Sequence, residues 1–190
     1  IVRAAERAAE IADAVAEISA ASALLIPVEV ERLGSLGVVS SEPGSAEHRA
    51  FLALVDETRP EVDRTLEKVE SAMLRAESVN TASVEALRQS MAILETVRVR
   101  VDDGTATVTG VVSAFEVVTD QAIDAIASAD ALITTIDFGS QRAVGLVRRL
   151  GLTTAMLTTV RDELHSVGAT ALGATDISRE ERAARPVRHD

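Results

Sequence analysis

The sequence contains no cysteine, tryptophan or tyrosine, and only three of its 190 residues are phenylalanine. Without cysteine the chain can form neither disulfides nor cysteine-ligated metal sites, and thiol catalysis is excluded. Sandwich and barrel folds usually carry more aromatic side chains, whereas helices cored by Ala, Leu, Val and Ile pack closely without them. Proline and glycine are also scarce, at 4 and 10 residues, which favours long elements over many turns. The composition therefore predicts an all-α fold.

Positive charge is also in short supply, because 30 Asp and Glu outweigh 19 Lys and Arg and give a formal net charge of −11. This balance argues against nucleic acid or an anionic bilayer surface as a partner. We find no apolar run of about 18 residues, so we expect no membrane span within the chain, and no signal peptide is recognisable. Because the chain begins Ile1-Val2-Arg3 without Met, we expect it to be part of a longer polypeptide.

Apolar residues recur at helical spacing along the chain and predict an antiparallel bundle of about six helices, forming a single domain over residues 1–190. The first and longest helix is expected to end near Val39, and its inward row repeats every seven residues. The other helices are expected over 46–78, from 81 or 83 to 102, over 107–136, after Ser140 and after Ser178. Short loops between them favour antiparallel neighbours.

Single residues add local predictions to this scheme. Ser45 is expected to cap the second helix, with His48 at position N3. Pro60 is expected to kink that helix or divide it in two. Thr119 and Thr153 fall on inward stripes, where a threonine hydroxyl most often bonds the carbonyl one turn back.

The stretch LLIPVEVERLGSLGVVSS, residues 24–41, places charged side chains on an apolar helix. Heptad spacing puts Arg32 in an inward row and Glu29 in the adjacent one, and Pro27 is expected to bend the helix just before them. An inward guanidinium must find a partner, reach solvent or hold an anion. Three interpretations stay open: an ion pair with Glu29 and the arginine reaching the surface, a helix or dimer contact, and a small-anion site.

Further arginines lie at the margins of inward stripes, at Arg98, Arg142 and Arg149. Arginines that converge with hydroxyl groups between helices would suit a small oxyanion such as nitrate, through charge-assisted hydrogen bonds.

Signals for catalysis are weak. The three histidines His48, His165 and His189 are far apart and share no metal-ligand spacing. The sequence contains neither a glycine-rich phosphate loop nor a nucleophile-elbow motif. We therefore expect a protein that is not an enzyme and that needs no metal and no cofactor.

The run PVEVERLGSLGVVSS resembles the first-helix motif of the nitrate- and nitrite-sensing family, a Gln-x-Glu-Arg-x-x-Ser-like segment. Glu31, Arg32 and Ser35 match the motif, while Glu29 stands where the family often has Gln. The later run LRQSMAILETVRVRVDDGTATVTGVVSAFEVVTDQAIDAI is similar to the central part of the family. The second family motif, a Lys-Glu…Glu-Arg pattern, is not matched, and RAVGLVRRLGLTTAMLTTVRDEL occupies its place.

The resemblance implies an extracytoplasmic sensor domain of a membrane-bound receptor, such as a histidine kinase, diguanylate cyclase or chemoreceptor. By this match Arg32 would bind a small anion such as nitrate or nitrite, beside Ser35 and Glu29, and Arg142 and Arg149 are positional candidates from the second motif. Residues 1–14 would be the membrane-proximal start of the first helix and 186–190 a tail, with a homodimer expected and membrane attachment through flanking segments. The alternative is a helical dimerisation module without a small-molecule ligand, supported by the long heptad row of the first helix.

Overall fold

Four helices make up the part of the chain that the computed structural model describes, residues 2–75 and 81–135. They are α1 (Val2–Ser40), α2 (Ala46–Arg75), α3 (Thr81–Asp102) and α4 (Val108–Thr135). The predicted all-helical fold with a long first helix is confirmed for these residues, and the predicted bounds agree to within one helical turn. The fifth and sixth predicted helices lie outside the described residues. All described residues belong to one compact unit, residues 1–150.

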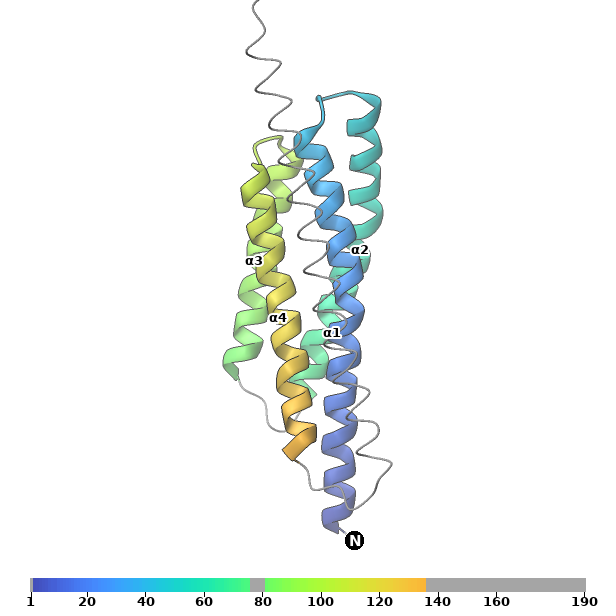
Figure 1. The fold of residues 1–190 in the computed structure, drawn as a ribbon, viewed down its shortest axis with the longest axis vertical. Coiled ribbons are helices and arrows are strands. Elements are labelled where there is room, and N and C mark those ends of the chain that lie inside the picture. Colours follow the sequence, from blue (N-terminus) through green and yellow to red (C-terminus); the bar gives the residue numbers. More distant parts are fainter. Residues whose placement is uncertain (1, 76–80, 136–190) are drawn as a thin grey trace, which may run out of the picture. The chain divides into compact units, whose positions relative to one another are not determined.

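Two short turns reverse the chain and make α1–α2 and α3–α4 antiparallel hairpins (Figure 1). In the first turn Gly44 has a φ of 77°, and the Ser45 hydroxyl accepts a hydrogen bond of 3.0 Å from the backbone N–H of His48. The predicted cap at Ser45 is therefore confirmed. In the second turn Gly104 has a φ of 67°, and Thr107 caps α4 by accepting a 3.1 Å bond from the N–H of Gly110. Glycine tolerates these left-handed conformations because it lacks a Cβ.

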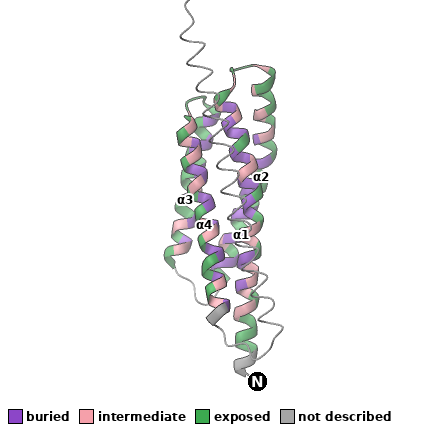
Figure 2. Ribbon diagram, in the orientation of Figure 1, coloured by how far each residue is buried: buried purple, intermediate pink, exposed green. Residues whose placement is uncertain are grey.

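The long helix α1 packs against both α2 and α4, and α3 packs mainly on α4 (Figure 1). Because α1 has neighbours on two sides, its middle is buried around most of its circumference (Figure 2). Three neighbouring heptad rows of α1 turn inward there. The buried members of the first row are Ala14, Ala21, Val28 and Ser35. Those of the second are Glu17, Leu24, Glu31 and Val38, and those of the third are Ile18, Leu25 and Arg32. A helix that is apolar on most faces is expected in such a central place.

Close approach of α1 and α2 near their shared turn depends on two glycines of α1. A Cβ at Gly37 would overlap the ring of Phe51, and a Cβ at Gly34 would lie 2.9 Å from Cγ2 of Val55. The absence of side chains at these two positions therefore lets α2 lie directly against the backbone of α1.

Apolar stripes of α2, α3 and α4 form the remaining core. In α2 the stripe Val55, Val62, Leu66, Val69 and Met73 is buried. In α3 Val84, Leu87, Leu94 and Val101 are buried, and Met91 is half-buried. Thr119 is buried in α4 and donates a 3.0 Å hydrogen bond to the carbonyl of Phe115, as predicted. Thr153 lies outside the described residues.

Two prolines lie inside helices without ending them. Pro27 is in α1 and Pro60 is in α2, and both helices continue through these residues. The suggested division of the second helix at Pro60 is therefore wrong. Packing against the neighbouring helices stabilises each helix on both sides of its proline, which offsets the lost backbone hydrogen bond.

One sequence-based prediction on membranes needs correction. The segment Ala5–Ser40 of α1 is long and apolar enough to cross a membrane, although we expected no such segment. The prediction required an uninterrupted run of apolar residues. A helix with scattered polar residues can reach the same mean hydropathy without such a run. A central helix of a soluble bundle passes the same test, and part of this segment is buried within the fold. Length and composition alone therefore do not assign a membrane span.

Candidate functional site

Arg32 lies in the buried middle of α1 and is only 2% exposed. Its Nε donates a 2.8 Å hydrogen bond to Oε2 of Glu29, and its Nη2 lies 2.6 Å from the same oxygen. The ion pair considered from the sequence is therefore present, but the guanidinium does not reach the surface. A buried guanidinium needs a negative partner, and in this arrangement a single carboxylate oxygen supplies it.

Two polar atoms at this site make no hydrogen bond to any residue that the structure describes. One is the buried Oγ of Ser35, and the other is Nη2 of Arg32, which is in ion-pair contact with Glu29 at 2.6 Å. Ser35 itself is 1% exposed. The two residues are three positions apart on α1, so their side chains share one face of the helix, one turn apart. Buried polar groups without a partner are rare and point to a ligand, an ion or water at the position.

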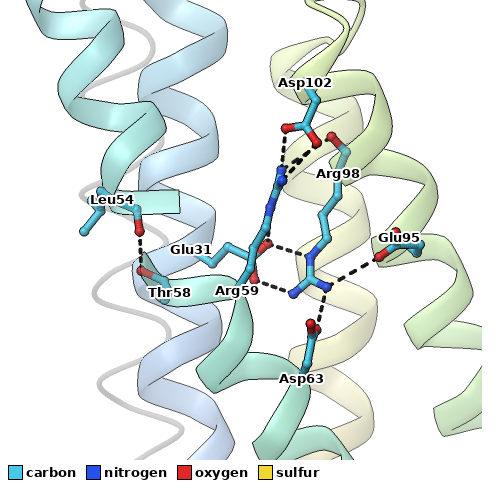
Figure 3. A network of polar contacts seen from close by, with 8 residues as sticks. All are labelled: Glu31, Leu54, Thr58, Arg59, Asp63, Glu95, Arg98 and Asp102. Atoms are coloured by element: carbon cyan, nitrogen blue, oxygen red, sulfur yellow. Dashed lines mark hydrogen bonds and ion pairs between the residues drawn. The ribbon is translucent and has the colours of Figure 1, made fainter. Parts of the chain in front are cut away.

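A second arginine, Arg98 of α3, ties α1 to α3 and α2 through charged hydrogen bonds. Its Nε and Nη2 donate to the two oxygens of Glu31, both at 2.7 Å, and its Nη1 donates to Asp63 of α2 at 2.6 Å (Figure 3). The side chain of Glu31 is completely buried, and that of Arg98 is 8% exposed. Two parallel charge-assisted bonds fix both the distance and the orientation of the partners.

Burial lowers the pKa of Arg98, but the hydrogen bonds and charges of Glu31 and then Asp63 raise it, and the pKa ends above its ordinary value. Arg59 of α2 extends the cluster, since its Nη atoms hold both oxygens of Asp102 at 2.8 and 2.9 Å and its Nε lies 3.6 Å from Glu31 (Figure 3). Helices α1, α2 and α3 therefore meet at one ionic cluster, composed of Glu31, Arg59, Asp63, Glu95, Arg98 and Asp102 (Figure 3).

This cluster and the Arg32 site differ in what they can bind. Within the cluster, four carboxylates surround two guanidinium groups, so its net charge is negative and an anion would be repelled. Because Glu31 gives both oxygens to Arg98, it leaves the adjacent Arg32 to Glu29. Arg32 and Ser35 therefore place a guanidinium and a hydroxyl group on one face of α1 outside this acidic cluster.

An open groove of about 430 Å³ lies between α1 and α2 but does not include Arg32. It is lined by Ala23, Ile26, Pro27, Val30, Leu54, Glu57, Thr58 and Glu61. Two glutamates and a largely apolar wall make this groove unsuitable for an anion. The groove at Pro27 therefore does not provide space beside Arg32.

The family model for nitrate and nitrite sensing matches residues 24–150, which is more than half of the chain. The chain belongs to the nitrate- and nitrite-sensing family. Comparison with curated proteins and with solved structures gives no match. Domains of this family are sensing modules of signalling receptors rather than catalytic domains.

The match begins at Leu24, so it contains the Arg32 site and the whole ionic cluster of this nitrate- and nitrite-sensing domain. Of the five residues predicted for the site, the structure brings Glu29, Arg32 and Ser35 together on α1. Arg142 and Arg149 lie outside the described residues.

The ion pair between Glu31 and Arg98 in the sensing domain was not predicted, although each residue carried a signal of an inward position. Arg98 continues the heptad row of Val84 and Met91 in α3, and Glu31 lies in a row with Leu24 and Val38 in α1. Two opposite charges on inward rows of different helices are candidates for a buried pair. Arg59, Asp63 and Asp102 carried no such signal, because they are half-buried or exposed and do not belong to the inward rows.

Proposed function

We propose that this domain binds nitrate or nitrite at Arg32 and transmits the binding event through α1 to the output module of a membrane receptor. The observation that carries the proposal is the buried guanidinium of Arg32, whose one partner among the described residues is a single carboxylate oxygen of Glu29, beside the buried Ser35 hydroxyl that makes no hydrogen bond to them. A planar oxyanion can accept two parallel bonds from the guanidinium fork and a third from the hydroxyl of Ser35.

The position of Arg32 couples a bound anion to the rest of the domain through the neighbouring Glu31. Arg32 follows Glu31 directly in α1, and Glu31 is fixed to Arg98 of α3 and lies near Arg59 of α2. A change in the place or tilt of α1 at Arg32 must therefore be accommodated by the ionic cluster. An anion shifts this equilibrium only as far as it binds one arrangement more tightly than the other.

The setting of the domain is part of the proposal. We place residues 1–190 outside the cytoplasm as one sensor domain, with residues 1–14 at the membrane and membrane spans in flanking segments. A histidine kinase, diguanylate cyclase or chemoreceptor module would receive the signal. Support comes from the family, whose members occur in signalling receptors, and from the apolar α1. Arg142 and Arg149 are proposed as further cationic contacts for the anion.

Arg32→Ala should abolish the stabilisation of the domain by nitrate. Bound ligand at about 100 times its Kd stabilises a folded protein by about 2.7 kcal/mol, which thermal unfolding in nitrate and in equimolar chloride measures. Arg32→Lys keeps the charge without the planar fork and should retain a weakened response. The control is Arg64→Ala, which removes an exposed arginine of α2 and should leave the response unchanged. A full nitrate response in Arg32→Ala would refute the proposed site.

A second proposed function, dimerisation through α1, is supported by an exposed apolar stripe. Ile26 is 71% exposed and Leu33 is 45% exposed, and they are seven residues apart on one face of α1. Sedimentation of wild type should give a dimer, and Ile26→Ser with Leu33→Ser should give a monomer, because a helix pair needs this apolar seam. Ile93→Ser on α3, 43% exposed, is the matched control. A monomeric wild type would contradict this function.

A further inference from the structure

The contact between Glu29 and Arg32 has the chemistry of a bound anion. A carboxylate and a nitrate are both planar groups that present negatively charged oxygens to a guanidinium. In this structure Oε2 of Glu29 takes the bond from Nε of Arg32 at 2.8 Å and lies 2.6 Å from Nη2. Glu29 therefore occupies the edge of the guanidinium at which an oxyanion would bind. We propose that Glu29 is an internal competitor that the sensed anion must displace from Arg32. This inference rests on the proposed function.

Electrostatics favour exchange over joint occupancy. With Glu29 in place, the buried pair is neutral. Adding a nitrate without removing Glu29 would set two negative groups against one guanidinium in a site where Arg32 is 2% exposed, and repulsion between like charges is strong where water is excluded. Replacing Glu29 by nitrate keeps the pair neutral, so the exchange needs no additional buried charge.

Glu29 is also held in a way that allows it to leave. Its side chain is 12% exposed, against 3% for Arg32, so the carboxylate lies on the solvent side of the pair. Both residues belong to one turn of α1, and among the described helices the hydrogen bond and ion pair of Glu29 go to Arg32 of the same helix. The pair of Glu31 and Arg98 differs in each respect, since it joins two helices through two bonds and its carboxylate is fully buried.

An internal competitor sets the affinity of the site. While Glu29 holds Arg32, the anion finds only the fraction of molecules in which the guanidinium is free, and the apparent Kd rises by the inverse of that fraction. The domain would then respond at higher anion concentrations than it would if no carboxylate at position 29 held Arg32. The length and charge of residue 29 would tune that range without any change at Arg32.

Glu29→Gln should bind nitrate about tenfold more tightly than wild type by isothermal titration calorimetry, which corresponds to about 1.4 kcal/mol. It should also unfold at a lower temperature without anion, because Arg32 then lacks a charged partner. Glu29→Asp keeps the charge but withdraws the carboxylate by one methylene, so it should also bind more tightly. The charge control is Glu57→Gln, an exposed carboxylate of α2 that lines the groove, and its affinity should match wild type.

A second experiment uses formate as the probe. Glu29→Ala removes the internal carboxylate, so its unfolding temperature should be higher in formate than in chloride of equal ionic strength. The double variant Glu29→Ala with Arg32→Ala should show no such difference. Wild type should respond much less, because Glu29 already holds the site.

The outcomes separate this inference from the proposed function. If Arg32→Ala loses nitrate binding while Glu29→Gln and Glu29→Asp bind no more tightly than wild type, the competitor is refuted and the anion site stands. If Glu29→Gln and Glu57→Gln gain affinity equally while Glu29→Asp does not, general charge repulsion replaces competition and the inference fails. If Arg32→Ala still binds nitrate, both are wrong.

Discussion

Arg98→Met should destabilise the domain by about 3–5 kcal/mol, because it leaves the carboxylate of Glu31 buried without its partner. The side chain of Glu31 has no exposed surface, and both of its oxygens accept bonds from Arg98 at 2.7 Å. Arg59 is the nearest remaining cation, at 3.6 Å, but its Nη atoms are engaged with Asp102. Loss of that amount is a large part of the total stability of a domain of this size.

Urea denaturation of the variants measures this effect through the midpoint, provided that the slope of the transition is unchanged. The double variant Glu31→Met with Arg98→Met should recover most of the loss, because two apolar side chains of similar volume replace the buried pair. Asp63 is 52% exposed, so water solvates it once Arg98 is gone. Arg88→Met is the matched control, since Arg88 pairs with Glu70 while 53% exposed, and such pairs contribute at most about 1 kcal/mol.

Equal losses in the single and double variants would contradict this account. That result would mean that the shape of the arginine side chain, rather than the charge left on Glu31, determines the stability of this contact. A loss in Arg98→Met no larger than that in Arg88→Met would show that Glu31 reaches water, and the cluster would then not couple α1 to α3.

The bounds of the four helices were predictable because local signals agree with the fold. The helical period is unbroken between turn signals, and residues such as Ser45, Gly104 and Asp102 mark where helices begin and end. Pro60 was the exception, because its effect depends on packing that the sequence alone does not display. The inward position of Arg32 also followed from spacing.

The partners of the charged residues were not predictable in the same way. Glu31 and Arg98 are 67 positions apart, so their meeting depends on which faces of α1 and α3 pack together. Heptad rows show that each points inward but not that they face each other. The contact of Glu29 with Arg32 was easier to predict, because two residues three positions apart on a helix can meet whatever the tertiary fold.

Phe115→Ala should destabilise the domain by about 3–5 kcal/mol, since it removes a whole ring from the core and leaves a cavity that the surroundings fill only in part. Phe115 has no exposed surface and is the largest of the fully buried side chains among the residues whose burial the structure describes. The chain contains only three phenylalanines, and many of the neighbouring core positions in α4 are alanine, as at Ala114, Ala122 and Ala125. Small rigid neighbours cannot extend into the space.

Phe115→Leu keeps most of the volume and should lose less than about 1.5 kcal/mol, as volume-conserving exchanges do. Val117→Ala is the surface control on the same helix, because Val117 is 37% exposed, and its change should lie within about 0.5 kcal/mol. Urea denaturation measures the change in unfolding free energy of all three variants from the transition midpoint, provided that the slope of the transition is unchanged. A Phe115→Ala variant as stable as Phe115→Leu would mean that the helices close around the missing ring, and α4 would then shift against α1. Because the ring carries no charge and Arg32 keeps its partner Glu29, the nitrate response of both variants should equal that of wild type.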